Sequence, residues 1–202
     1  MELLGSRGMP RAGRLAAVAT AAAATLVAGL GVAALANDGD FATSEIASYA
    51  LSHFAPGAFG GQCIVFAERV VDAVYRAGGL AHGFPPAGGP QGYYTAFARS
   101  GGQLVGEAGP GGYAAALALA QRGDIVQLSP RPAASAGPWT DPGGGHQHTA
   151  ILLGPASGGA EVIDSNWDLH LRVLIHPLAD VVADAVRWRL EIAVWGYGLP
   201  GP

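Results

Sequence analysis

The sequence contains one cysteine, Cys63, and its surroundings favour a reactive thiol. A thiolate is the nucleophilic form of cysteine, and an ordinary free thiol loses its proton with a pKa of about 8.5. Cys63 follows a Gly-Gly-Gln turn and precedes residues 64–77, where apolar residues recur at helical spacing. The first turn of a helix stabilises an anion, because its N–H groups are unpaired and the helix dipole is positive there. The alternative for a lone cysteine is a small buried apolar side chain.

Two histidines, His146 and His148, follow a run of three glycines and offer a base for that thiol. His148 begins a predicted strand over residues 148–153, whose side chains alternate between two faces. An imidazole has a pKa near 6.5, which suits it to take a proton from a thiol. His148 is therefore the candidate base, and His146 remains a competitor on the preceding loop.

A third polar group would orient the imidazole, and Asp164 and Asn166 are the candidates for that role. They lie at the end of the next predicted strand, residues 160–164, and period-two alternation places both on one face. The set Cys63, His148 and Asp164 or Asn166 has the composition of a nucleophile, a base and an orienting group. The alternative for the Asp-Ser-Asn run is a simple turn.

The elements that must position these residues are helical first and extended afterwards. Glycine- and proline-rich segments over 78–112 and 129–145 are predicted to be loops, with one short helix near 91–99. Further helices are expected over 44–54, 64–77 and 113–121, and strands over 125–128, 148–153, 160–164, 171–175 and 187–194. This order predicts an α+β domain in which the N-terminal helices pack on an antiparallel sheet.

The first 36 residues have the pattern of an export signal. Three arginines precede an uncharged apolar stretch over 15–36, which ends in Ala34-Leu35-Ala36. We expect residues 1–36 to be a signal peptide and residues 37–202 to be the exported domain. The 22-residue stretch also has the length of a membrane span, so a retained N-terminal anchor is the alternative. In both cases the domain would lie outside the cytoplasm.

Composition excludes several classes of protein. Half of the residues are hydrophobic and only 13% are charged, which argues against a charge-rich disordered chain. All 11 basic residues are arginines and no basic run occurs after residue 14, which argues against nucleic-acid binding. No glycine-rich loop carries a lysine, so a phosphate or nucleotide site is not expected. We expect no cofactor and no metal.

A zinc hydrolase is a rival interpretation, because His146 and His148 have the spacing of two ligands on one strand face. Lysostaphin-type wall metallopeptidases use such a pair together with an upstream His-x-x-x-Asp motif. In this chain only His176 and Asp180 have that spacing, and they lie downstream of the pair. The order of the residues therefore disfavours zinc.

Five short motifs occur in an order that resembles the CHAP domain, the cysteine, histidine-dependent amidohydrolase/peptidase family of the papain-like clan. The resemblance covers residues 44–200. The motifs are Gly61-Gln62-Cys63, Gly123-Asp124-Ile125-Val126, His148-Thr149-Ala150-Ile151-Leu152, Asp164-Ser165-Asn166-Trp167 and Trp195-Gly196-Tyr197-Gly198-Leu199-Pro200.

The resemblance implies a papain-like fold and hydrolysis of amide bonds in bacterial cell-wall peptidoglycan by a secreted, wall-associated enzyme. It implies that Cys63 is the nucleophile and His148 the base. Asp164 stands where the family usually has Glu, and Asn166 occupies the polar position two residues on. Since Asp is one methylene shorter than Glu, Asn166 competes with Asp164 for contact with His148. The alternative function is a non-catalytic wall-binding or partner-binding module on the same fold.

Overall fold

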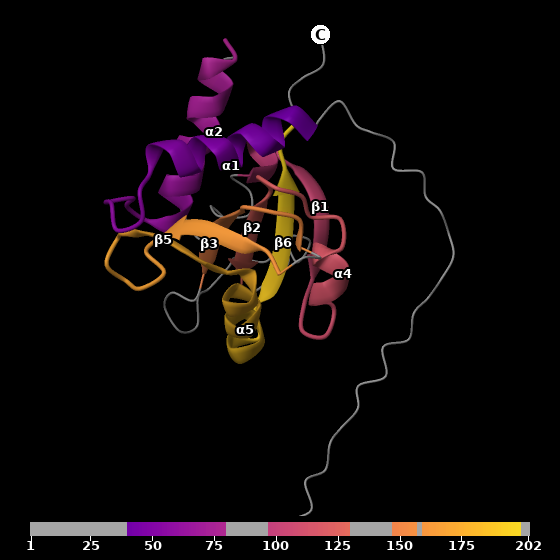
Figure 1. Ribbon diagram of the computed structural model, residues 1–202. Coiled ribbons are helices and arrows are strands. Elements are labelled where there is room, and N and C mark those ends of the chain that lie inside the picture. Colours follow the sequence, from indigo (N-terminus) through magenta and orange to yellow (C-terminus); the bar gives the residue numbers. More distant parts are fainter. Residues whose placement is uncertain (1–39, 80–96, 130–146, 157–158, 199–202) are drawn as a thin grey trace, which may run out of the picture. The chain divides into compact units, whose positions relative to one another are not determined.

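The computed structural model describes residues 40–79, 97–129, 147–156 and 159–198. Its centre is an antiparallel sheet of six strands in the order β1-β6-β2-β3-β4-β5 (Figure 1). The strands are β1 Gln103–Ala108, β2 Ile125–Ser129, β3 His148–Leu152, β4 Glu161–Ser165, β5 Val173–Pro177 and β6 Glu191–Gly196. The helices with given bounds are α1 Asp40–His53, α2 Cys63–Ala77, α4 Tyr113–Leu117 and α5 Leu178–Trp188. The chain therefore has a mixed α/β fold with an open sheet.

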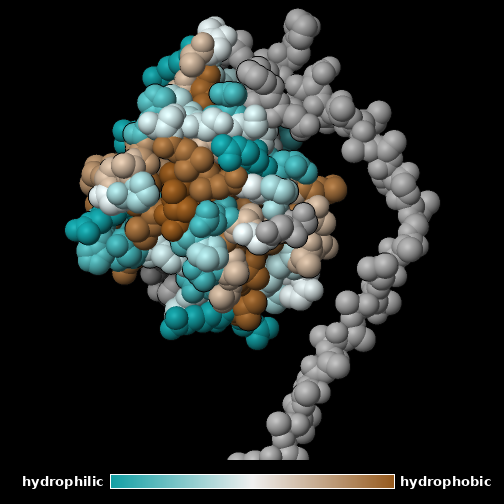
Figure 2. Space-filling model, in the orientation of Figure 1, coloured by the Kyte–Doolittle hydropathy of each residue, from teal (hydrophilic) through white to brown (hydrophobic). Residues whose placement is uncertain are grey.

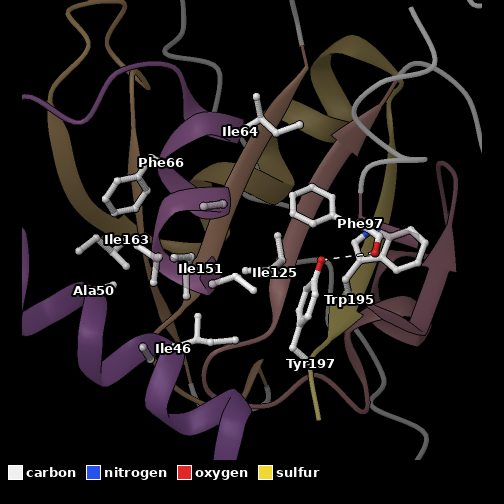
Figure 3. Packing of buried hydrophobic residues seen from close by; sticks show 14 of the residues in the cluster. Ile46, Ala50, Ile64, Phe66, Phe97, Ile125, Ile151, Ile163, Trp195 and Tyr197 are labelled. Atoms are coloured by element: carbon white, nitrogen blue, oxygen red, sulfur yellow. Dashed lines mark hydrogen bonds between the residues drawn. The ribbon is translucent and has the colours of Figure 1, made fainter. Parts of the chain in front are cut away.

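Apolar side chains cover both faces of this sheet. On one face, α1 and α2 pack against Ile125, Ile151 and Ile163 of three neighbouring strands (Figure 3). On the other face, α4 and α5 pack against a second cluster that includes Val126 and Leu152. Period-two alternation explains the division, since Ile125 and Val126 are consecutive residues that point to opposite faces.

Helix α2 forms because its apolar residues recur every three or four positions. Its buried residues are Cys63, Ile64, Phe66, Ala67, Val70, Val71 and Tyr75. This stripe faces the sheet, where Phe66 also packs edge-to-face on Phe54 with ring centroids 5.0 Å apart. The predicted helix over 64–77 is thus confirmed, and Cys63 is its first residue.

The C-terminal motif around Trp195 and Tyr197 lies in the core. The indole N–H of Trp195 donates a hydrogen bond to the side-chain oxygen of Gln127 on β2 at 3.2 Å. The Tyr197 hydroxyl lies 2.7 Å from the Ser100 hydroxyl, and the Tyr197 carbonyl accepts a hydrogen bond from Thr43 of α1 at 3.0 Å. These contacts give the motif a structural role that joins both ends of the domain.

Two elements were not predicted from the sequence. Helix α5 occupies 178–188, so the predicted strand over 187–194 begins only at Glu191, after Arg189 in the left-handed conformation ends the helix. Strand β1 lies inside the segment that was expected to be loop. It contains Gly106, whose backbone approaches Ala116 so closely that a Cβ would overlap it. That close contact explains a glycine in a strand, which disfavours strand prediction.

Several sequence predictions lie outside the described residues. They are the signal peptide or anchor over 1–36, His146, and the aromatic residues of the loops before Phe97 and after Ser129. Among the described residues, no helix combines the length and apolar character needed to cross a membrane.

Candidate active site

A glycine turn fixed to the sheet positions the start of α2. Gly61 has a φ of 82°, a conformation that favours glycine. The N–H groups of Gly60 and Gly61 donate to the Leu171 carbonyl at 2.9 and 3.3 Å. The Ser165 hydroxyl donates to the Gly61 carbonyl at 2.7 Å. Cys63 follows two residues later, so the end of β4 determines where the thiol lies.

Gly60 allows no side chain, and we predict that Gly60→Ala disturbs this turn. An added Cβ would overlap the Ser165 side chain and come within 2.9 Å of Val173. Overpacking of this kind costs about 1–3 kcal/mol of folding free energy. We expect a lower melting temperature and slower alkylation of Cys63 by iodoacetamide in the folded variant. Gly154→Ala is the matched control, because nothing lies within 4 Å of a Cβ there. Equal alkylation rates in the two variants would show that the turn does not position the thiol.

The sheet register places His148, Asp164 and His176 on one face. Ala150 of β3 lies opposite Asp164 of β4, and His148 lies two residues from Ala150. His176 of β5 lies opposite Val162, which is two residues from Asp164. Side chains two residues apart share a face, so all three polar side chains converge.

Within this cluster, Asp164 holds the His148 imidazole. The distance from His148 Nε2 to Asp164 Oδ2 is 2.8 Å, and Asp164 is fully buried. The same imidazole is the neighbour that lowers the pKa of the Cys63 thiol, in a residue only 4% exposed. Since Nε2 faces the carboxylate, Nδ1 is the nitrogen left for the sulfur. The Trp167 ring packs edge-on against His148, with centroids 4.8 Å apart, and restricts the imidazole further.

The three ionisable groups shift each other's pKa values. Burial raises the pKa of the Cys63 thiol, but hydrogen bonding and the charge of His148, with backbone hydrogen bonds from Thr149 and Ile64, hold it below its ordinary value. Burial lowers the pKa of His148, but hydrogen bonds with Asp164 and Cys63 raise it to about 9. Burial raises the pKa of Asp164, and hydrogen bonds from His148 and His176 outweigh that effect and lower it. The pairing therefore favours a thiolate beside an imidazolium more than it would for an isolated thiol and an isolated imidazole.

This ion pair predicts a particular pH dependence. Because the pKa of Cys63 is lowered, its alkylation by iodoacetamide should stay fast below pH 8.5 and fall only at more acidic pH. His148 loses its proton near pH 9, so any reaction that needs a proton from it should slow above that pH, whereas alkylation should not. Alkylation rates measured from pH 4 to 10 check this. A single rise centred near pH 8.5 would contradict it.

Asn166 does not hold His148. The expectation that it orients the imidazole in place of Asp164 is therefore wrong. Asn166 comes directly after the end of β4 and has a φ of 68°. This turn of the backbone ends the alternation of side chains between the two sheet faces, on which the expectation depended. The Asn166 amide nitrogen donates to Gln62 Oε1 at 3.0 Å, and its oxygen accepts from the Leu171 N–H at 3.0 Å. Asp164, rather than Asn166, therefore contacts the imidazole.

His176 and Trp167 are additions to the predicted site, whereas the sequence already offered Gln62, next to Cys63, as a possible contributor to oxyanion stabilisation. The ring of Trp167 packs against both His148 and His176, with centroids 4.8 and 4.5 Å away. In the sequence, His176 stood out only through its zinc-ligand spacing with Asp180, and in the structure Asp180 Oδ2 lies 3.7 Å from His176 Nδ1. The sequence did contain one indication of its place in the site. His176 lies on the strand that follows the strand of Asp164, and consecutive antiparallel strands commonly pair side by side. Within the described ranges, no group of three or more His, Cys, Asp or Glu residues is arranged to hold a metal.

Comparison with known proteins gives no family: no family model, no curated protein and no solved structure matches this chain.

Proposed function

We propose that this chain is a thiol-dependent hydrolase of amide bonds, with Cys63 as nucleophile and His148 as general base and acid. One observation carries the proposal: a cysteine at the start of a helix has its pKa lowered by a neighbouring histidine, and Nε2 of that histidine lies 2.8 Å from a buried carboxylate. A nucleophile bonded to a base, and a base bonded to an orienting group, are what covalent acyl transfer needs.

The chemistry proceeds in two steps. The Cys63 sulfur attacks the carbonyl carbon, and the C–N bond breaks as His148 gives a proton to the leaving amine. This leaves a thioester on Cys63 and a neutral His148, which then takes a proton from water as the water oxygen attacks the thioester. The products are a carboxylic acid, which releases its proton to the solvent, and the restored thiolate–imidazolium pair. Asp164 stays ionised throughout and stabilises the imidazolium.

The oxyanion of the first step needs hydrogen-bond donors near the sulfur. The Cys63 backbone N–H stands at the start of α2, where helix N–H groups have no partner within the helix. Gln62 is a second donor, because its side-chain oxygen accepts from Asn166 and its NH₂ group is left to donate. In this account Asn166 acts on the site through Gln62.

The substrate class follows from the resemblance to the CHAP domain, and with it we propose that the helices packed on this antiparallel sheet form a papain-like fold. We propose that the substrate is bacterial cell-wall peptidoglycan, that the enzyme is exported, and that residues 1–36 serve as signal peptide or anchor. The surface of the described residues offers apolar contacts for a peptide, and Figure 2 shows apolar residues gathered on the face drawn. Two exposed apolar side chains lie near in sequence to the hydrogen-bonded pair Gln62 and Asn166. They are Phe59, which is 71% exposed, and Leu169, which is 83% exposed. Residues 37–202 carry a net charge of about −6, so binding to an anionic wall must come from such contacts.

Digestion of purified peptidoglycan, followed by mass spectrometry of the fragments, tests this function. We expect new fragments that each carry a freed amine or carboxyl group, which identifies the bond that is cut. Cys63→Ala protein should release none of them. A wild-type digest without new fragments, but with protein bound to the wall, would instead support a binding module.

A further inference from the structure

His176 contacts the same carboxylate oxygen that holds the base. Its Nε2 lies 2.7 Å from Asp164 Oδ2, and His148 Nε2 lies 2.8 Å from that same oxygen. The other oxygen, Oδ1, is buried and has no hydrogen-bond partner. One of the two hydrogen bonds that fix this carboxylate among the described residues therefore comes from His176.

We propose that His176 is a positioning residue for the hydrolysis proposed above, acting on Cys63 through Asp164 and His148. A carboxylate held by a single bond can turn about its Cα–Cβ and Cβ–Cγ bonds, and it would carry the imidazole with it. The second N–H donor fixes Oδ2 in place, so His148 keeps its Nδ1 directed at the thiol. Outer partners that orient a metal-bound histidine commonly change activity by about 10- to 100-fold, and we expect an effect of the same order for a partner that orients this imidazole through its carboxylate.

The surroundings of His176 suit this role. Its side chain is only 11% exposed, and its ring packs at 33° to that of Trp167 with centroids 4.5 Å apart. Two acidic groups face it among the described residues: Asp164 from β4 at Nε2 and Asp180 from α5, 3.7 Å from Nδ1. Asp164 is an acceptor at Nε2, so the proton belongs on that nitrogen and the ring donates to Oδ2.

Two substitutions of similar size separate the hydrogen bond from the packing. In His176→Gln, the amide nitrogen stands three bonds from Cβ, as Nε2 does in histidine, and so retains a donor toward Asp164. In His176→Asn, the shorter side chain withdraws that donor. We expect the Asn variant to lose about 10- to 100-fold in kcat with little change in KM. We expect the Gln variant to keep most of the wild-type kcat.

The pH profile of Cys63 alkylation gives a readout of the base itself, and it is compared only between proteins whose circular dichroism and melting temperature show that they are folded, because unfolding also returns a thiol to its ordinary pKa. In the Asn variant, His148 no longer holds the thiolate firmly, so the acid limb of the profile should move to higher pH. The Gln variant should follow the wild type. His170→Asn is the matched control, because His170 is exposed and pairs with Asp168 rather than Asp164. A folded His176→Asn protein with the wild-type profile and kcat would overturn the proposal.

A further variant and the alkylation readout separate three outcomes: a variant that does not fold, a wrong substrate and a wrong mechanism. If His176→Asn does not fold, the same measurements on His176→Phe, which keeps a ring against Trp167 without a donor, decide the matter. If wild-type protein shows the shifted profile but does not cut peptidoglycan, the proposed substrate fails while the role of His176 is still tested by alkylation. If wild-type alkylation is that of an ordinary thiol, the hydrolase mechanism itself fails, and His176 has no base to position.

Discussion

Replacing Cys63 with alanine should reduce peptidoglycan hydrolysis by at least about 10⁴-fold while the fold is retained. Loss of a nucleophile removes the covalent pathway altogether, and what remains comes from binding and oxyanion stabilisation. Cys63 is buried at the first turn of α2, and alanine is a good helix former that fits the same space. Rates of release of soluble fragments, compared with the circular dichroism and melting temperature of each protein, check this prediction.

The control for this prediction is Cys63→Ser, which preserves the size of the side chain. A hydroxyl beside the same imidazole is a far weaker nucleophile than a thiolate at neutral pH, so we expect a similar loss. Release of fragments at the wild-type rate by either folded variant would remove Cys63 from the mechanism.

Asp164→Asn should produce the second largest effect, a loss of about 10³- to 10⁴-fold in kcat. The carboxylate accepts hydrogen bonds from both His148 and His176 at Oδ2. An amide that turns its NH₂ group toward His148 places the imidazole proton on Nδ1, which faces the thiol. The ring in that tautomer cannot accept the proton of Cys63. The lowered pKa of Cys63 should also return toward its ordinary value, because the imidazolium loses its counter-charge.

Asp168→Asn is the matched control, since Asp168 pairs with exposed His170 at 3.3 Å and lies outside this cluster. Both variants remove one negative charge from neighbouring parts of the chain. We expect full activity and an unchanged alkylation profile for Asp168→Asn. Equal activity in the two folded variants would mean that Asp164 does not orient the base.

The sequence indicated most of the elements that carry the site, because their patterns are local. The apolar spacing over 64–77 predicted α2 and placed Cys63 at its start, and the alternation around His148 predicted β3. The order of strands in the sheet depends on pairings between distant residues, which no local pattern specifies. β6 inserts between β1 and β2, and β1 itself was missed.

The contacts between the site residues were harder to predict than the identity of the residues themselves. The alternation rule placed Asp164 and Asn166 on one face, but the chain leaves the strand after Ser165 and Asn166 adopts a positive φ. Its amide consequently bonds Gln62, and Asp164 rather than Asn166 accepts the hydrogen bond of the His148 imidazole. His176 was not expected beside Asp164, because its contact depends on the register between β4 and β5.

The most direct test of the account is hydrolysis measured against the fraction of Cys63 that carries an alkyl group. Protein is treated with iodoacetamide for increasing times, the modified fraction is read by intact mass spectrometry, and each sample is assayed on peptidoglycan with and without chelator. Cys63 is the one cysteine in the chain, so the modified site is unambiguous. The account predicts that hydrolysis falls in proportion to the alkylated fraction and does not respond to chelator. Full hydrolysis by completely alkylated protein would contradict it.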